Sequence, residues 1–364
     1  MLIIKSYNDR YQSAWDEFVM NSSEASFFHL TGWKNAVEKN FGHKAHYAMA
    51  MRDEKICGIL PLIEIKSRFF GHALVSIPYA VYGGIAALDK ESHYSLRRCA
   101  ETLAELIHVD YLELRNVCSS SLFKLSEPNA YLNSLGVPSD LNYSKWNSKN
   151  LYVTFKREIF DTVTGNLEAI PRKQRAMVRK GEKYGLSSKI GTIEDLEQFY
   201  GIYATNVRDL GSPVYPLSFL HSLMENFSDA FILSIWKGGE MVAGVLTFVH
   251  KDTLLPYYGG GLREYFEYAI NDFMYWELMK YGCENGFKVF DFGRSKKETG
   301  SYRFKKHWGF EPSDLDYQCF LVKAKEMPNV SPVNPKYQFM ISVWKRLPLA
   351  VTNWLGPKLV RGIP

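Results

Sequence analysis

Tyr111-Leu-Glu-Leu-Arg-Asn116 has a counterpart 178 residues later, Val289-Phe-Asp-Phe-Gly-Arg294. Both stretches alternate side chains in the way that is typical of a strand with one buried face. Two more pairs of similar stretches follow the same order along the chain, residues 54–63 with 240–249 and residues 81–85 with 257–261. Three matches in the same order indicate a duplicated fold, and two copies are too few for a solenoid.

Both halves predict the same coarse plan of early helices, a strand meander, and a strand–helix–strand crossover. In the first half we expect helices at 11–20, 30–40 and 91–108, and strands at 2–7, 45–51, 56–65, 74–77, 84–87 and 111–114. In the second half we expect helices at 171–184, 193–210, 216–226 and 265–285, and strands at 230–236, 241–250, 254–258, 289–292 and 315–322. This order predicts an α/β (α+β) protein of two similar domains, residues 1–150 and 151–326, followed by a basic, proline-rich tail at 327–364.

The chain has 364 residues and a net charge of +5, and two segments hold most of the excess. Residues 171–189 carry seven cations and one acid, and residues 327–364 carry five cations and no acid. Such local charge argues against a nucleic-acid binder that uses its whole surface, and it favours an anion site or a membrane-facing patch. No apolar stretch reaches the length of a membrane span, no secretory leader is evident, and the five cysteines are scattered. We therefore expect a cytoplasmic protein.

Several stretches carry a resemblance to a known family. They are Phe27-Phe-His-Leu-Thr-Gly-Trp33, the strand around Gly58, Pro171-Arg-Lys-Gln-Arg-Ala-Met-Val-Arg-Lys180, Tyr257-Tyr-Gly-Gly-Gly261, Phe290-Asp-Phe-Gly-Arg294 and Tyr302-Arg-Phe-Lys-Lys-His-Trp-Gly-Phe310. On these residues the chain resembles the FemAB-type transferases, which consist of two tandem domains of the GNAT acyltransferase fold. It looks most similar to the branch associated with exosortase and PEP-CTERM exopolysaccharide systems. The resemblance spans about residues 1–325.

The resemblance implies transfer of an acyl or aminoacyl group to a cell-envelope or exopolysaccharide precursor, a nucleotide- or lipid-linked glycan. Better-known members form peptidoglycan bridges from aminoacyl-tRNA. This chain lacks their long helical hairpin between residues 171 and 310, and has Pro78-Tyr-Ala-Val-Tyr-Gly-Gly84 where they have Arg-Gly-Pro. Acyl-CoA is therefore the expected co-substrate, with tRNA as the less favoured donor and no metal. Peripheral contact with the inner membrane, through the tail, is a further expectation.

Three residues are candidates for the chemistry of acyl transfer, which needs an oxyanion stabiliser and a route for one proton. The family resemblance implies that Lys305 faces the substrate, where it would neutralise a phosphate or the oxyanion, and the alternative is a solvated basic turn. Asp291 lies in an apolar strand, where it would accept a proton or hold Arg294, or only cap a neighbouring backbone. His307 is a candidate general base, with packing beside Trp308 as the alternative.

The remaining candidates, Arg294 among them, would bind substrate or donor. Arg172, Arg175 and Arg179 share one helical face that suits a diphosphate or polyanionic glycan, and a plain solvated face is the alternative. Tyr82, Tyr258 and Trp33 would line a cleft with rings, or pack in the core. Gly259, Gly260 and Gly261 would form the loop that cradles the CoA pyrophosphate, although their spacing departs from the usual motif.

Two other classes of function stay open. In the first, the duplicated fold has lost its donor site and only binds a polysaccharide precursor or a membrane partner. In the second, the basic helix binds RNA, which a single patch supports weakly. The tail contains Trp344-Lys-Arg-Leu-Pro348 and Trp354-Leu-Gly-Pro-Lys358, stretches that suit an anionic membrane surface or else pack back on the domains. Its six prolines predict that it is not one long helix.

Overall fold

The structure is a computed structural model, and it describes residues 1–117, 146–327 and 335–363. The first half begins with β1 (Leu2–Ser6), α1 (Gln12–Asn21) and α2 (Thr31–Phe41), which short 3-10 turns precede at Asp9–Tyr11 and Phe27–His29. Its strands are β2 (Lys44–Ala45), β3 (Ala48–Arg52), β4 (Lys55–Leu60), β5 (Ile63–Ser67), β6 (Gly71–Val75), β7 (Ala86–Ala87) and β8 (Tyr111–Val117). Helix α3 (Lys90–Leu106) precedes β8 and begins where the Asp89 carboxylate accepts the Ser92 backbone N–H.

The second half follows the same plan. It contains the strands β9 (Trp146–Ser148), β10 (Tyr152–Glu158), β11 (Ser187–Gly191), β12 (Phe231–Lys237), β13 (Glu240–His250), β14 (Thr253–Gly261), β15 (Val289–Lys296) and β16 (Pro312–Leu321). Its helices are α5 (Val163–Ala169), α6 (Arg172–Lys183), α7 (Leu196–Leu210), α8 (Leu217–Asn226), α9 (Ile270–Glu284) and α10 (Gly300–His307), with 3-10 turns at Ile193–Asp195 and Arg263–Tyr268.

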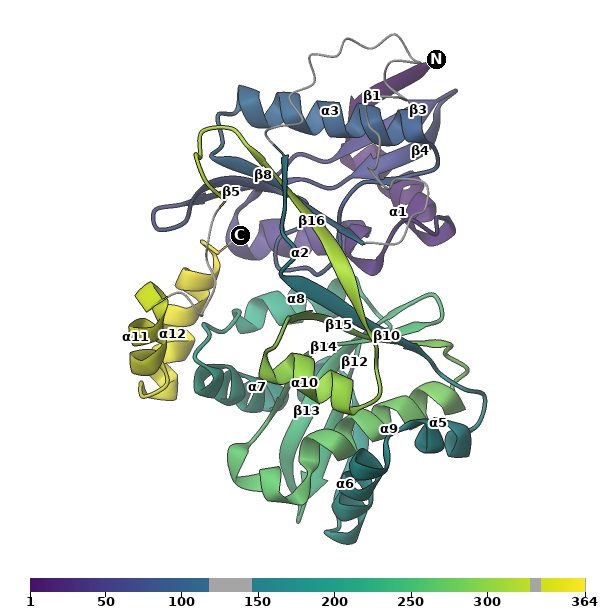
Figure 1. Cartoon of the computed structure of the whole chain (residues 1–364), viewed down its shortest axis with the longest axis vertical. Helices are drawn as coiled ribbons and strands as arrows, with labels where there is room; N and C mark the ends of the chain where they lie inside the picture. The colour runs from purple at the N-terminus through teal and green to yellow at the C-terminus, as the bar shows by residue number, and fades with distance from the viewer. Residues whose placement is uncertain (118–145, 328–334, 364) are drawn as a thin grey trace.

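One long mixed sheet joins the halves. Its strand order is β11-β12-β13-β14-β15-β10-β16-β8-β6-β5-β2, and a smaller sheet has the order β1-β3-β4-β7. Strand β16 makes the connection: its start pairs with β10, and Leu315 to Leu321 pair with β8. Figure 1 shows β16 running from the lower half of the molecule into the upper half. The two halves therefore share backbone hydrogen bonds, although a linear division at residue 150 puts β8 and β16 in different domains.

The duplication is visible in the parallel strand pairs. In the second half β14 and β15 are parallel and pair only at Thr253↔Val289 and Leu254↔Phe290. In the first half β6 and β8 are parallel and pair over three residues. Two of the three sequence matches therefore fall on equivalent strands, β4 with β13 and β8 with β15. The third does not, because residues 81–85 precede β7 outside any strand, whereas residues 257–261 belong to β14.

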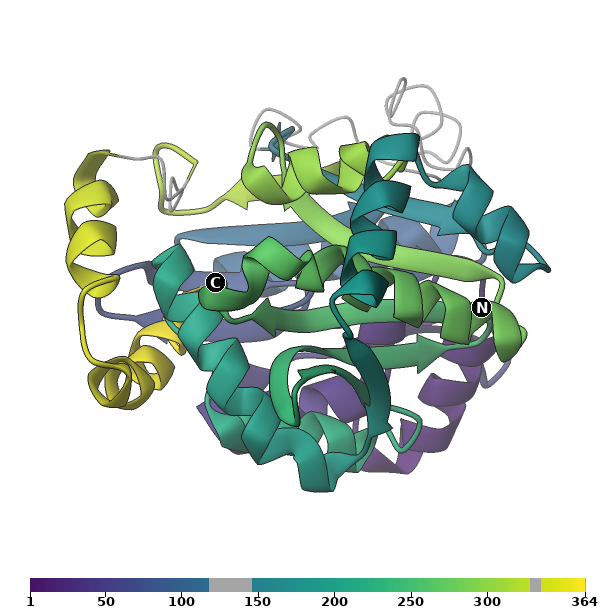
Figure 2. The ribbon, with the colours of Figure 1, turned by 90° about the horizontal axis from the view of Figure 1, so that it is seen from below.

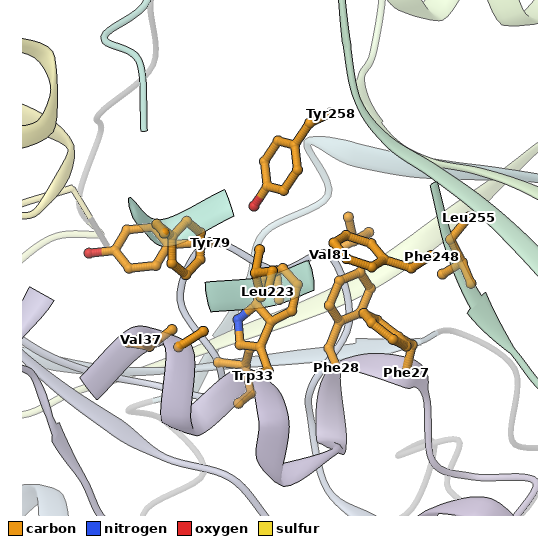
Figure 3. Close-up of a cluster of buried hydrophobic side chains, with 14 of the residues drawn as sticks. Phe27, Phe28, Trp33, Val37, Tyr79, Val81, Leu223, Phe248, Leu255 and Tyr258 are labelled. Carbon is orange, nitrogen blue, oxygen red and sulfur yellow. The ribbon is translucent and has the colours of Figure 1, made fainter. Parts of the chain in front are cut away.

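The largest apolar core lies where the halves meet. It includes Phe27, Phe28 and Trp33 from the first half and Leu223 and Phe248 from the second. Figure 3 shows these side chains packed against one another. The rings of Phe27 and Phe248 stack with centroids 4.8 Å apart. Buried aromatic contacts of this kind make the junction a true core rather than a loose domain interface.

The tail forms two short helices, α11 (Pro335–Trp344) and α12 (Leu349–Val360), with Pro348 between them. The prediction that the tail is not one long helix is confirmed, and Pro357 nevertheless lies inside α12. Both helices lie beside the body on one side of the molecule (Figures 1 and 2). Across the described parts of the chain, no helix has both the length and the apolar character that spanning a bilayer requires.

Candidate functional site at the junction of the two halves

Asp291 is the centre of a polar cluster built from both halves. It lies on β15, and its side chain is almost fully buried. Its Oδ1 atom accepts hydrogen bonds from the Tyr82 hydroxyl at 3.0 Å and from the Gly293 backbone N–H at 2.8 Å. Its Oδ2 atom lies 3.1 Å from the ammonium of Lys156 on β10. Three donors therefore compensate the burial of this carboxylate, as a buried charge requires.

Tyr82 reaches the second half from the segment after β6. Its hydroxyl also forms a short hydrogen bond with the Thr154 hydroxyl on β10, and the Lys156 ammonium lies 4.6 Å from the centre of its ring. Burial, reinforced by the Asp291 charge, raises the pKa of the Tyr82 phenol well above its usual value. Tyr82 therefore stays protonated and acts as a hydrogen-bond donor to Asp291.

Lys305 lies on α10, beside the same strand. Its ammonium donates to the backbone carbonyls of Phe292 at 2.7 Å, Gly293 at 3.2 Å and Arg294 at 3.2 Å. Pairing between β14 and β15 ends at Phe290, so these carbonyls lie just beyond the point where the two strands separate. An ammonium has three N–H donors, and all three have partners here. In this structure the Lys305 ammonium therefore binds three backbone carbonyls of β15. To bind a substrate oxygen, it would have to give up one of these hydrogen bonds.

The surroundings of Lys305 change its proton affinity. Burial lowers the pKa of Lys305 to about 7, the nearby Arg294 charge acts in the same direction, and the Asp291 charge opposes both. At neutral pH the group is thus close to half-protonated. A lysine of this kind is able to take up or release a proton in the range where enzymes work.

Arg294 follows on β15 and is surrounded by tyrosine rings. Its Nη1 atom donates to the Tyr317 hydroxyl at 3.2 Å, and its guanidinium lies 4.5 Å from the centre of the Tyr152 ring. Tyr317 in turn donates to the backbone carbonyl of Val81, in the segment that carries Tyr82. A guanidinium has five donors. Among the described residues, no hydrogen-bond partner is seen for the remaining donors of Arg294.

Other predicted residues lie apart from this cluster. His307 is exposed at the end of α10. On α6, Arg172 and Arg179 are exposed and Arg175 is half-buried, and none has an acidic partner among the described residues. The start of α6 is nevertheless close to the end of α10, because a Cβ on Gly309 would lie 3.1 Å from Pro171. The arginine face therefore belongs to the same end of the second half as α10, but it does not reach Asp291.

The aromatic candidates are mostly core residues. Trp33 is fully buried and donates its indole N–H to the Pro78 carbonyl at 3.2 Å. Tyr258 is also buried within the cluster of Figure 3, and its hydroxyl has no partner in the described residues. Of the three predicted rings, Tyr82 alone contacts Asp291. Core packing, the alternative that the sequence left open, describes Trp33 and Tyr258 in this structure.

The placement of the three glycines in a loop at a helix N-terminus is wrong. Gly259, Gly260 and Gly261 are the last residues of β14, and α9 begins only at Ile270. A Cβ on Gly260 would lie 3.1 Å from the Cα of Tyr203 on α7. Glycine at position 260 therefore allows helix α7 to approach the sheet closely, which is one of the known reasons for glycine inside a strand.

The sequence reasoning missed Thr154 and Lys156. Both lie on β10, a strand that it did not predict, and both face the Asp291 cluster. The alternation of Tyr152-Val-Thr-Phe-Lys-Arg-Glu158 was the available signal. The alternative for Lys305, a solvated basic turn, is also wrong, because residues 303–307 belong to α10. This helix begins where the Thr299 hydroxyl accepts the Tyr302 backbone N–H.

The described residues contain no group of three or more histidine, cysteine, aspartate or glutamate side chains placed to hold a metal ion. The candidate site consists instead of a buried carboxylate, two lysines, an arginine and tyrosine hydroxyls. Such groups suit proton transfer and the binding of negative charge.

The fold is that of two tandem GNAT-like domains with mixed sheets flanked by helices. Residues 172–306 match the family model Acetyltransf_6, described as an acetyltransferase (GNAT) domain. The match begins at α6 and ends within α10, so it includes Asp291, Arg294 and Lys305. A search of curated proteins finds no match.

Solved structures resemble the whole chain. The crystal structure of FemX aligns with a TM-score of 0.65 and 15% identity, over 93% of this chain and 100% of that one. The structure of L-PGS from Bacillus licheniformis aligns with a TM-score of 0.55 and 12% identity, over 94% and 97% of the two chains. A tandem GNAT protein from the clavulanic acid biosynthesis pathway aligns with a TM-score of 0.53 and 10% identity, over 90% and 100%. At these identities the likeness is one of fold.

Proposed function

We propose that this protein is an acyltransferase that moves an acyl or aminoacyl group onto a nucleotide- or lipid-linked glycan precursor of the cell envelope or an exopolysaccharide. The observation that carries the proposal is the acetyltransferase (GNAT) match at residues 172–306, which contains Asp291, Arg294 and Lys305. The match supports acyl-CoA as the donor. The name of another fold neighbour, a putative lysylphosphatidylglycerol synthetase from Agrobacterium fabrum, keeps an aminoacyl donor and a lipid acceptor open.

In the proposed reaction an acceptor hydroxyl or amine attacks the donor carbonyl carbon. The new C–O or C–N bond forms, the bond to the donor's leaving group breaks, and one proton leaves the acceptor. Lys305, once one of its carbonyl bonds opens, supplies positive charge to the developing oxyanion. Asp291 orients Tyr82 and Lys156 and receives the proton through them, while Arg294 and the α6 arginines hold the negative charge of the substrate.

A donor-binding and turnover experiment tests the proposal. Calorimetry of the full chain with acetyl-CoA, a longer acyl-CoA and a charged tRNA identifies the donor, and incorporation of labelled acyl groups into envelope lipid and nucleotide-sugar fractions then follows transfer. We expect micromolar acyl-CoA binding and a loss of turnover in Lys305→Met. The adjacent Lys306→Met is the matched control, because Lys306 is exposed on the same helix. Equal turnover in the two variants would contradict the assigned role of Lys305.

Two observations favour a second candidate function, a non-catalytic protein that binds a glycan precursor. The glycines expected to cradle the CoA pyrophosphate lie inside β14, and the Lys305 ammonium already has three carbonyl partners. The same calorimetry separates the two functions. Binding of a nucleotide-sugar or lipid-linked glycan, with no binding of any acyl donor, would favour the second.

A further inference from the structure

The two tail helices present one face to the body and another to the outside. On α11, Trp344 is buried and donates its indole N–H to the Ser212 carbonyl at 3.0 Å, and Ile341 packs over Gly211. On α12, Thr352, Gly356 and Val360 follow at intervals of four and are buried, so they form one helical face. The backbone carbonyl of Arg361 accepts a hydrogen bond from the His43 ring at 3.0 Å. The tail is thus attached to the body along a defined inner face.

The outer face is apolar where a surface helix is usually polar. On α11, Phe339 is 76% exposed and Met340 60%, and Val343 continues the same side. On α12, Trp354 is 65% exposed, and Val351 and Lys358 lie on the same side, opposite the buried face. Single exposed apolar side chains need no explanation, but five large ones on two adjacent short helices form a patch. We call Phe339, Met340, Val343, Val351 and Trp354 the outer apolar patch.

The charge around this patch has one sign. Lys345, Arg346, Lys358 and Arg361 are exposed on or next to the two helices, and none has an ion pair among the described residues. Residues 327–364 contain no aspartate or glutamate. The Lys358 ammonium lies 3.5 Å from the centre of the exposed Trp354 ring. Aromatic and aliphatic side chains mixed with cations, and with no acids, are typical of helices that lie in the surface of an anionic bilayer.

We propose that α11 and α12 form a docking surface for an anionic phospholipid membrane, with the outer apolar patch inserted at the level of the headgroups and with Arg346 and Lys358 placed against lipid phosphates. A partner protein would meet such a patch with acidic side chains, whereas a bilayer offers both negative charge and an apolar layer in one plane. The proposal goes beyond the transfer reaction and does not depend on it. It would bring the protein to the place where lipid-linked precursors are held.

Vesicle co-sedimentation of the full chain tests the proposal. The probes are vesicles of phosphatidylcholine alone and vesicles of phosphatidylcholine mixed with phosphatidylglycerol. We expect binding to the mixed vesicles only, and release in high salt because the electrostatic part of the attraction is screened. The double variants Phe339→Ser/Trp354→Ser and Lys345→Glu/Arg346→Glu should each bind at least tenfold more weakly. Point variants are preferable to truncation, because Trp344, Thr352 and Val360 are buried against the body.

Two matched controls separate the tail from generic surface effects. Met20→Ser changes an exposed apolar residue on α1, on the opposite side of the view in Figure 1. Arg10→Glu/Lys55→Glu reverses two exposed cations of the first half, at the 3-10 turn Asp9–Tyr11 and at the start of β4. Both should keep full vesicle binding and, with the tail variants, an unchanged circular dichroism spectrum. No binding to the mixed vesicles, or equal binding by the tail variants, would overturn the proposal. So would light scattering that shows a dimer lost in Phe339→Ser/Trp354→Ser, because the patch would then be an interface between two copies.

Discussion

Replacing Tyr82 with phenylalanine removes one hydroxyl and leaves the ring in place. The hydroxyl donates to the buried Asp291 carboxylate at 3.0 Å and is bonded to Thr154, whose side chain is also buried. A hydrogen bond to a charged group contributes about 2 kcal/mol, and leaving the Thr154 hydroxyl without a partner costs about 1 kcal/mol more. The expected loss is therefore about 3 kcal/mol. Because Tyr82 belongs to the first half and its partners to the second, the loss falls on the junction.

Thermal unfolding measures this loss. The entropy of unfolding scales with length and is about 0.8 kcal/mol/K for 364 residues, so a decrease of about 3 kcal/mol lowers the midpoint by roughly 4 °C. The control is Tyr265→Phe, which removes a hydroxyl that donates to Glu240 at 2.7 Å on the surface. Its midpoint should change by no more than about 1 °C, because exposed hydrogen bonds to charged groups contribute little. A Tyr82→Phe midpoint within the control's range would refute the view that this contact holds the two halves together.

Three other changes have expected outcomes. The pKa of Lys305 is lowered to about 7 in the folded chain, so between about pH 7 and pH 10 the unfolded chain holds a proton on this lysine that the folded chain has lost. The free energy of unfolding should therefore rise with pH, by up to about 1.4 kcal/mol per pH unit. If the wild type and Lys305→Met show the same pH dependence in denaturant unfolding, this expectation is wrong. Gly260→Ala should destabilise the protein by about 2 kcal/mol, because its Cβ would lie 3.1 Å from the backbone of α7. The control Gly201→Ala should have a smaller effect, because the space around Gly201 is open. Midpoints of urea unfolding measure both effects, and equal midpoints would contradict the expectation. Changing Arg172, Arg175 and Arg179 together to glutamine should weaken binding of a diphosphate-containing substrate at least tenfold in calorimetry. The thermal midpoint should not change, because none of the three has an acidic partner in the described structure. Unchanged affinity would show that these side chains only face solvent.

Much of the fold is predictable because its signals are local. The alternation of residues 289–292 and the glycines in the turn between β12 and β13 predict strands that the structure contains. Residues 56–65 were predicted as one strand but form parts of β4 and β5, because the chain turns after Leu60. Strand β10 was missed although its alternation is clear. Local patterns identify elements well, but they do not reveal which strand of one half extends the sheet of the other.

The site is less predictable because its contacts are distant in sequence. Asp291 and Lys305 were candidates from the strand pattern and the family resemblance. The partners of Asp291 come from 209 residues upstream at Tyr82 and from the unpredicted β10 at Lys156. No spacing rule links such positions. The hydrogen bonds from Lys305 to three carbonyls of β15 depend on the point where β14 separates from β15. That separation is a property of the whole sheet and not of any single segment.

The duplication allows the proposed site around Asp291 to be compared with the equivalent position in the first half. Glu113 on β8 is the counterpart of Asp291 on β15, and each has a lysine ammonium 3.1 Å away, Lys149 beside Glu113 and Lys156 beside Asp291. In the first half the buried Arg115 also bonds Glu113 at 2.8 Å and donates to the carbonyls of Ile77 and Ala80.

Burial alone would raise the pKa of Glu113, but the charges of Arg115 and Lys149 outweigh it and lower the pKa to about 2. Glu113 therefore stays ionised, and its carboxylate is held by Arg115 and Lys149. A carboxylate held in this way is poorly suited to proton transfer. In the second half Gly293 stands at the position equivalent to Arg115, and it contributes a backbone N–H to Asp291 where the first half has a guanidinium. Gly293→Arg would therefore place a guanidinium beside Asp291, and it would also strain the backbone because Gly293 has a φ of +65°. If Asp291 takes part in the reaction, that change should abolish turnover, and the equivalent substitution Arg115→Gly should lower stability without creating a second active site.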